Sequence, residues 1–367
     1  MKILIISGYF YPQNTPRAFR TTELVNEFVR RGDDVTLYIP TSTADLSKFE
    51  KEEHLCIKYF RWREDIYVKS NNKIKYLYGR VISHIFEYPD IFILKDLTIA
   101  LKDEAKDYDI MITIAYPHQI HWTLALLYKK SVKFADTWIA DCGDPFMLCG
   151  TINIPHMPFF KYYEKLWCKY CDVITVPTQG AINGYYPEFH NKIQVIPQAF
   201  NFNEVRRKEY KPNAVPTFAY SGSLWPGSKD PRTLLEYLST LQDIDFKFYI
   251  YYNTNNTQFL EKYREPLGDK LILSSFIPRL ELLETLSGMD FLVNFEFTTG
   301  VQSPSKMIDY TLTGRPVLSI NCDHLDKEKI QEFLSGNYHN SYSLPNIEDY
   351  NVKNVVNKMV SFHKNRV

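Results

Sequence analysis

The chain has few glycines and cysteines and no net charge. Its 367 residues include 14 Gly and 6 Cys, and its 43 Lys and Arg balance 43 Asp and Glu. Six scattered cysteines do not make a disulfide framework at this length. The neutral balance excludes the broad basic surface of a non-specific nucleic-acid binder, and a hydrophobic content of 45% excludes a mainly disordered chain.

Long hydrophobic runs are also missing from the sequence. The apolar run after Lys2 stops at Ser7, which is too short for a secretory signal, and no stretch approaches the roughly 18 apolar residues of a spanning helix. We therefore expect a cytoplasmic protein with reduced thiols. The length predicts two domains, because single cores stop growing near about 250–300 residues.

Alternating strand and helix patterns predict two α/β domains. A β-type run at Lys2–Ser7, a helical pattern at 17–31 and a strand at Asp34–Pro40 form a βαβ unit, which implies a parallel sheet. A second series follows a polar stretch, so two doubly wound domains are expected to face each other across a cleft. The expected parts are a first domain at 1–198, a linker at 199–216, a second domain at 217–345 and a C-terminal helix at 346–367 that packs back on the first domain.

The loop and helix start after the first strand form a candidate anion site. Tyr9, Arg17 and Arg20 lie in this segment, and the amides at a helix start favour negative charge. A plain loop with solvated arginines is the alternative. A dinucleotide fingerprint is excluded, because it needs three glycines where this loop has one.

Two later segments of the first domain carry candidate catalytic groups. Asp141 and Asp144 follow a strand, and Asp144 can bind sugar hydroxyls or act as a base; capping of the next turn is the alternative. His118 begins a helix at the same sheet edge and can contact a sugar or a phosphate. His121, one turn further along, is more typical of a packed residue.

In the second domain, two loops each lead into a helix. The first contains Gly222, which allows close backbone approach, then Ser223, and the cationic Lys229 and Arg232. The second contains the residues Ser303, Ser305, Lys306 and Asp309. Lys306 and Asp309 share a helix face, so one can neutralise a diphosphate while the other binds ribose hydroxyls. Helix capping by the serines with a local ion pair is the alternative.

Two short patterns look like metal motifs, but we expect neither to bind metal. Asp243 and Asp245 form a DxD at a helix-to-strand junction, and Cys168 and Cys171 form one CxxC without a partner pair. The sequence has no P-loop, no HExxH and no G-x-S-x-G. We expect no metal and no resident cofactor.

Four segments together resemble a known family. They read IISGYFYP at 5–12, WIADCGDPF at 138–146, SGSLW at 221–225 and SPSKMIDY at 303–310, the last followed by GRPV. The chain resembles bacterial glycosyltransferases of family 4 with the GT-B fold over nearly its whole length. The resemblance implies retaining transfer of a sugar from a nucleotide-sugar to a glycan or lipid-linked acceptor, in the biosynthesis of capsule, lipopolysaccharide or another surface polysaccharide.

The resemblance also implies roles for individual residues. Asp309 takes the place of the second Glu of the family's E-x7-E signature, which holds the donor ribose, and Lys306 and the backbone of 303–305 face the donor. Lys229 or Arg232 binds the phosphates, and Ile277 joins the donor-binding set. Three departures from the pattern stand out: Asp309 is shorter than Glu, Val301 stands where the first Glu would be, and Gly143 replaces an arginine of the DPW-type motif. Glu296 lies outside the signature spacing.

The expected chemistry needs no metal. Cationic side chains and helix amides can hold a pyrophosphate between the two lobes and stabilise the leaving group, with Lys229, His118 and Asp144 as the catalytic candidates. Retention by a front-face path needs no nucleophile, whereas an inverting enzyme would use Asp144 as its base. A nucleotide-sugar 2-epimerase and an inactive nucleotide- or glycan-binding protein are the alternatives.

Two segments of the first domain are candidates for membrane contact. Residues 69–86 and 159–170 both mix Lys or Arg with aromatic residues, and such helices can lie on an anionic membrane. Inward packing with solvated lysines is the alternative. We expect peripheral attachment to the cytoplasmic face of the inner membrane.

Overall fold

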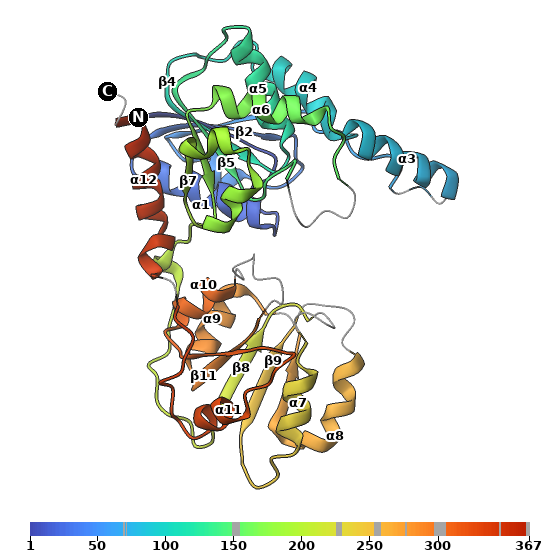
Figure 1. Cartoon of the computed structure of the whole chain (residues 1–367). Helices are drawn as coiled ribbons and strands as arrows, with labels where there is room; N and C mark the ends of the chain where they lie inside the picture. Colours follow the sequence, from blue (N-terminus) through green and yellow to red (C-terminus); the bar gives the residue numbers. More distant parts are fainter. Residues whose placement is uncertain are drawn as a thin grey trace. The chain divides into compact units, whose positions relative to one another are not determined.

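The chain forms two units, each with its own parallel sheet (Figure 1). Unit 1 comprises Met1–Asn201 with Glu348–Val367, and unit 2 comprises Phe202–Ile347. The computed structural model describes residues 1–68, 70, 72–148, 155–224, 230–252, 258–275, 277–296, 306–344 and 346–364, without the side chains of Glu50, Glu204 and Lys306.

Unit 1 contains a seven-stranded parallel sheet in the order β3-β2-β1-β4-β5-β6-β7. Its strands are β1 (Lys2–Ser7), β2 (Asp34–Pro40), β3 (Leu55–Phe60), β4 (Tyr108–Ala115), β5 (Ala135–Cys142), β6 (Val173–Val176) and β7 (Ile193–Val195). Its α-helices are α1 (Pro16–Arg30), α2 (Ser47–Glu50), α3 (Lys73–Phe86), α4 (Ile93–Ala100), α5 (Gln119–Lys129), α6 (Phe160–Tyr170) and α12 (Val352–Lys364). Short 3₁₀ helices lie at Asp90–Phe92, Gln179–Gly184 and Pro187–Lys192.

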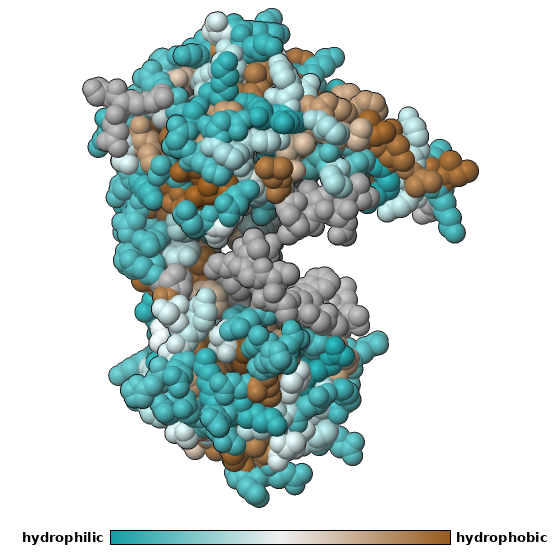
Figure 2. Space-filling model, in the orientation of Figure 1, coloured by the Kyte–Doolittle hydropathy of each residue, from teal (hydrophilic) through white to brown (hydrophobic). Residues whose placement is uncertain are grey.

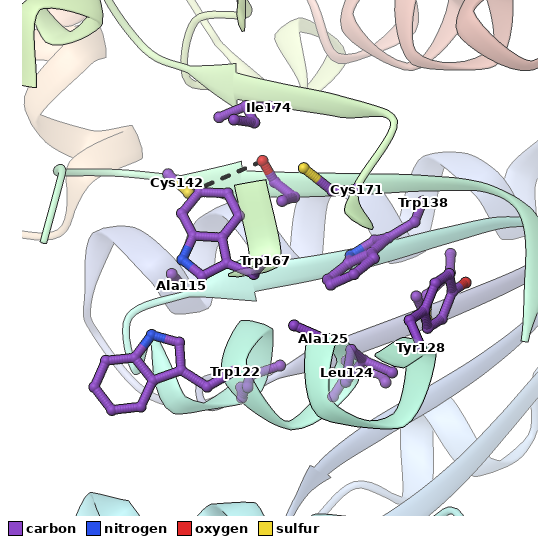
Figure 3. Packing of buried hydrophobic residues seen from close by; sticks show 14 of the residues in the cluster. Ala115, Trp122, Leu124, Ala125, Tyr128, Trp138, Cys142, Trp167, Cys171 and Ile174 are labelled. Atoms are coloured by element: carbon purple, nitrogen blue, oxygen red, sulfur yellow. Dashed lines mark hydrogen bonds between the residues drawn. The ribbon is translucent and has the colours of Figure 1, made fainter. Parts of the chain in front are cut away.

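Helices cover both faces of this sheet, which explains why its central strands are apolar throughout. Leu4 and Ile6 of β1 face a core layer shared with α4, α5 and α6, whereas Ile3 and Ile5 face a second layer shared with α1 and α12. Figure 3 shows part of the first layer, with Trp122 of α5, Trp138 of β5 and Trp167 of α6 among the labelled side chains. All three indoles are completely buried.

The last helix, α12, completes the second core layer of unit 1. It packs against α1, β4 and β5. Its buried residues are Val352, Val355, Val356, Met359 and Val360. The chain thus returns to unit 1 after unit 2 has been built.

Unit 2 contains a five-stranded parallel sheet in the order β10-β9-β8-β11-β12. Its strands are β8 (Thr217–Ser221), β9 (Lys247–Tyr251), β10 (Leu271–Ser274), β11 (Phe291–Phe295) and β12 (Val317–Ile320). Its α-helices are α7 (Arg232–Ser239), α8 (Arg264–Leu267), α9 (Arg279–Ser287), α10 (Lys306–Thr313) and α11 (Lys327–Leu334). Short 3₁₀ helices lie at Phe202–Glu204, Gln258–Tyr263, Gly268–Lys270 and, at the boundary with unit 1, Ile347–Tyr350.

The stretch predicted as a linker has contacts of its own with unit 2. The amide of Lys208 donates to Ser287 Oγ at 2.8 Å, and the Tyr210 hydroxyl donates to Asp290 Oδ1 at 2.8 Å. The other oxygen of Asp290 accepts from the amide of Thr217 at 2.7 Å. The polar composition predicts a linker here, and these hydrogen bonds fasten the segment to α9 and to the start of β11.

Candidate functional site

In unit 1, the carboxyl ends of β1, β4 and β5 gather charged residues from distant parts of the sequence. Arg20 of α1 is buried and donates from Nη2 to Asp141 Oδ1 at 2.7 Å and from Nη1 to the Pro197 carbonyl at 2.6 Å. Thr175 donates to the same Asp141 oxygen at 2.7 Å. Burial alone would raise the pKa of Asp141, but the charges of Arg20 and Arg17 outweigh it and hold that pKa below its ordinary value.

Arg17 is bound less closely than Arg20. Its Nη1 lies 3.5 Å from Asp141 Oδ2, and its side chain is 18% exposed. Burial lowers the pKa of Arg17, and the nearby Asp141 opposes that shift. Since Asp141 is already bonded to Arg20, the Arg17 guanidinium is the group of this cluster best suited to bind an incoming anion. Asp144, by contrast, is exposed.

The two histidines at the start of α5 are both buried. Within the described part of the chain, neither Nδ1 atom has a hydrogen-bond partner. Burial, helped by the neighbouring His156, lowers the pKa of His118 to about 3, so its imidazole is neutral near pH 7 and exchanges hydrogen bonds rather than charge. His121 packs on Trp167 at 4.9 Å, and its Nε2 lies 3.4 Å from Cys142 Sγ, as expected of a packed residue.

An aromatic cluster that sequence reasoning missed lies at the same edge of the sheet. Asp90 accepts from the Tyr116 hydroxyl at 2.5 Å and from Trp62 Nε1 at 2.7 Å. The ring of Tyr9 lies 5.4 Å from Trp62, edge to face, and 6.4 Å from Tyr116, stacked. Gly8 leaves room for the Trp62 ring, because a β-carbon there would lie 2.9 Å from Trp62 Cζ3 and 2.4 Å from Pro117 Cδ. No local pattern marks Trp62 and Asp90, since only the fold brings them to Tyr9.

In unit 2, the first predicted loop begins in a left-handed conformation. Gly222 has φ +136° and donates its amide to the Tyr251 carbonyl at 2.9 Å, and this φ favours glycine. The carbonyl of Ser223 accepts from the Tyr220 hydroxyl. Arg232 is half-buried at the start of α7 and donates from Nε to Asp230 at 2.9 Å. Lys229 lies outside the described residues.

The second predicted loop leads into α10, which is tied to two strands, β8 and β11, by one buried side chain. The Tyr310 hydroxyl accepts from the amide of Ser221 at 3.0 Å and donates to the carbonyl of Val293 at 3.0 Å. These bonds hold the first turn of α10, which begins at Lys306, at the carboxyl end of the sheet. Burial raises the pKa of Tyr310 to about 12.

Asp309 is held by an arginine that sequence reasoning missed. Arg279, the first residue of α9, donates from Nη2 at 2.6 Å and from Nε at 2.9 Å, both to Asp309 Oδ1. Ile277 is half-buried and packs on the cluster that contains Tyr310. Ser303 and Ser305 lie outside the described residues, as do Val301 and the side chain of Lys306.

Unit 2 also has a pocket that is lined by none of the predicted donor-binding residues that the structure describes. Its volume is about 370 Å³, and it lies between the end of α9, strand β9 and the segment 208–213. Tyr249 and Tyr251 stack in its wall with their ring centres 6.2 Å apart. The pocket extends to Thr217 at the amino end of β8.

The potential metal ligands of unit 1 lie at the amino-terminal edge of its sheet, opposite the carboxyl edge that holds the candidate site. Among the described residues, Asp109, Asp136 and His363 bring ligand atoms within 4.8 Å of one another, but Asp109 and Asp136 belong to the amino-terminal ends of β4 and β5. Asp109 already accepts from the amide of Lys2 at 2.8 Å. Cys168 and Cys171 are buried thiols whose pKa values are raised by burial.

Comparison with known proteins identifies the architecture. No family model and no curated protein matches the chain. Three solved structures match over nearly its whole length. A glycosyltransferase from Rickettsia africae has a TM-score of 0.60 and 13% sequence identity, with 99% of this chain and 98% of that chain covered. TarM has a TM-score of 0.58 and 12% identity (99% and 98% covered), and the apo form of the lipopolysaccharide outer core galactosyltransferase WaaB has a TM-score of 0.55 and 15% identity (100% and 98% covered). The likeness establishes the GT-B fold, two parallel-sheet α/β domains, and confirms the predicted fold class.

Proposed function

We propose that the chain is a glycosyltransferase that moves a sugar from a nucleotide-sugar donor to a glycan or lipid-linked acceptor. The observation that carries this proposal is the anchoring of α10. Tyr310 ties it to Ser221, at the carboxyl end of β8, and to Val293 of β11, and Arg279 orients Asp309 on its first turn. Ligands of open α/β sheets bind at this edge.

The start of α10 is the proposed pyrophosphate site. The first amides of a helix have no partner within the helix and carry the positive end of its dipole, which favours an anion there, and Lys306 adds a full charge. Asp309 Oδ1 is occupied by Arg279, so we assign Oδ2 to a ribose hydroxyl. Lys229 and Arg232 add positive charge, and Gly222 lets the backbone approach the diphosphate.

The proposed chemistry needs stabilisation of a diphosphate leaving group. Each preorganised donor aimed at the developing charge is typically worth about 2.7–4 kcal/mol. We propose retention without a protein nucleophile and without a metal, as in glycosyltransferases of family 4. Since His118 is neutral, its proposed role is a hydrogen bond to the sugar or acceptor, and the exposed Asp144 is the group able to accept a proton.

Unit 1 is the proposed acceptor-binding unit. The partly exposed rings of Tyr9 and Tyr116 offer apolar faces beside Asp90, and Arg17 offers a cation for a phosphate group. A lipid-linked acceptor suits both groups, because its sugar can pack on the rings and its anionic linkage can bind the arginine. These properties fit a place in surface polysaccharide biosynthesis, such as capsule or lipopolysaccharide assembly.

A donor-turnover assay tests the proposal. UDP-, GDP-, ADP- and dTDP-sugars are each incubated with the protein, with and without lipid-linked acceptor. Slow release of the nucleoside diphosphate from one donor, accelerated by acceptor, is the expected result. An isomerised sugar still attached to its diphosphate would identify an epimerase instead, and tight binding without any turnover would identify a binding protein.

A matched pair of lysine variants tests the binding site. Lys306 and Lys327 are the first residues of α10 and α11, two helices of unit 2 that are both eight residues long. Lys306→Ala should weaken nucleotide binding about tenfold or more, because it removes a charged contact to phosphate. Lys327→Ala should leave the affinity unchanged. Equal affinities of the two variants, measured by calorimetry, would refute the site.

A further inference from the structure

Helix α3 turns its apolar face toward solvent. Four of its exposed apolar side chains recur at the spacing of one helix face, and their exposed fractions are Ile74 80%, Leu77 65%, Tyr78 55% and Val81 46%. An amphipathic helix of a water-soluble domain normally buries this stripe against a core. Of the residues of α3, only Gly79 is buried.

The contacts of α3 with neighbouring segments involve Gly79 and Ser83. A β-carbon on Gly79 would lie 2.2 Å from Tyr67 Cβ, so the helix and the preceding turn are in close contact there. Ser83 donates to the Tyr88 carbonyl at 2.8 Å, and Asn72 caps the first turn through the amide of Ile74. Figure 1 shows α3 extending away from the other elements of unit 1.

Positive charge flanks the exposed stripe. Lys73, Lys75 and Arg80 are exposed, and α3 contains no acidic residue. The turn before the helix adds two exposed apolar side chains, Ile66 and Val68. Figure 2 shows hydrophobic residues gathered over this projection, with hydrophilic residues beside them.

The second segment with this composition behaves differently. Helix α6 also carries lysines and aromatic residues, but Phe160, Trp167 and Cys168 are buried in the core of unit 1. Its apolar face is therefore already covered, and only α3 keeps both the apolar stripe and the basic flanks available. In the described residues we find no helix both long and apolar enough to cross a bilayer, so the contact we infer for α3 is a superficial one.

We propose that α3 docks unit 1 on an anionic lipid bilayer, with Ile74, Leu77 and Val81 inserted at the headgroup boundary and the lysines facing the anionic headgroups. Charge complementarity selects this occupant over a second protein copy, because two α3 helices packed together would place like charges side by side. The inference rests on the proposed function for its purpose, which is to bring the transferase to a lipid-linked acceptor.

Vesicle co-sedimentation of the full chain tests the inference. Binding is expected to vesicles that contain phosphatidylglycerol, to be weak with pure phosphatidylcholine, and to fall as salt is raised. Lys73→Gln and Lys75→Gln should each reduce partitioning about fivefold. Leu77→Ser should reduce it about tenfold, through lost burial of one leucine side chain.

Matched control variants exist in the same unit. Lys102 and Lys106 are exposed lysines outside α3, and Ile99 is an exposed apolar residue of α4. The changes Lys102→Gln, Lys106→Gln and Ile99→Ser should leave vesicle binding unchanged. All of these side chains are exposed, so circular dichroism and thermal unfolding should be unaltered, which separates lost docking from lost folding.

Three outcomes would overturn the inference. They are no binding to anionic vesicles, equal losses in the α3 variants and the controls, and a dimer that Leu77→Ser dissociates while vesicles remain unbound. The proposed function is judged separately, by turnover of a water-soluble donor without vesicles. Turnover without vesicle binding would refute only the docking of α3 on a bilayer. Vesicle binding without nucleotide binding or turnover would refute only the proposed function.

Discussion

Cζ of Arg17 lies 2.9 Å from the position that a β-carbon on Gly143 would occupy. The Arg17 guanidinium, on α1, thus fills the space that a side chain at position 143, just after β5, would occupy. In the motif that residues 138–146 resemble, an arginine stands at the position of Gly143. Here an arginine from another element reaches the same place, and the glycine makes room for it.

This relationship predicts compensation between the two positions. Arg17→Ala should lower transfer to acceptor about tenfold or more by removing a charge-assisted contact, and adding Gly143→Arg to that variant should recover much of the loss. The readout is the transfer rate at saturating donor. Arg30→Ala, at the exposed end of the same helix, is the control. A double variant no better than Arg17→Ala would show that the two arginines are not equivalent.

The buried hydroxyl of Tyr310 leads to a second prediction. Tyr310→Phe leaves the amide of Ser221 without its partner, which should cost about 1–3 kcal/mol of unfolding free energy. Nucleotide affinity should fall too, because α10 loses its tie to β8. Denaturant unfolding and calorimetry measure the two effects. The exposed Tyr342→Phe should change neither, and an unaltered Tyr310→Phe protein would contradict the anchoring argument.

The Arg279–Asp309 pair yields a third prediction. Arg279→Ala should weaken nucleotide binding about tenfold, because the Asp309 carboxylate loses the donors that orient it. The matched control is Arg264→Ala, whose guanidinium pairs with Glu261 on the surface of the same unit. Calorimetric titration with the nucleoside diphosphate of the active donor decides the matter. If both variants bind alike, Asp309 does not hold the ribose.

A fourth prediction concerns pH. Burial raises the pKa of Glu164 to about 7, although the amide of Met147 lowers it in part. The folded state therefore holds this proton more tightly than the unfolded chain, whose carboxyl has its ordinary value near 4.5. The resulting stability is present below the unfolded pKa and is lost as the pH rises through the folded one.

Glu164→Gln should remove this dependence, because glutamine is neutral at every pH. Relative to the variant, the wild-type unfolding free energy should fall by about 2 kcal/mol between about pH 5 and about pH 8. Urea unfolding at both pH values provides the measurement. The exposed Glu265→Gln should show the wild-type difference, and parallel curves for wild type and Glu164→Gln would argue against a protonated Glu164.

The sequence predicts strands best where both faces are covered. The expected range Lys2–Ser7 coincides with β1, because every residue after Lys2 is buried and the apolar run is continuous. Strand β3 was not predicted. It lies at the sheet edge with one neighbour, and Lys58 interrupts its apolar residues. Helices α4 and α11 were also missed.

Side-chain partners were much harder to predict than elements. The sequence places Arg20 near a strand end, but its partner Asp141 is 121 positions away. Arg279 and Asp309 are likewise 30 positions apart. The spacing of residues along the sequence does not predict such ion pairs, because they depend on which strands the topology makes adjacent. The roles assigned to Lys306, Ser303 and Ser305 stay predictions.

The return of α12 to unit 1 has a consequence for biogenesis. Val355, Val356 and Met359 close a core layer whose other members, such as Ile3 and Ile5, leave the ribosome more than three hundred residues earlier. Until the last helix emerges, that layer stays uncovered while unit 2 is already free to fold. Unit 1 is thus translated first but completed last. A nascent chain stalled before Val352 would expose the apolar residues of this layer to chaperones.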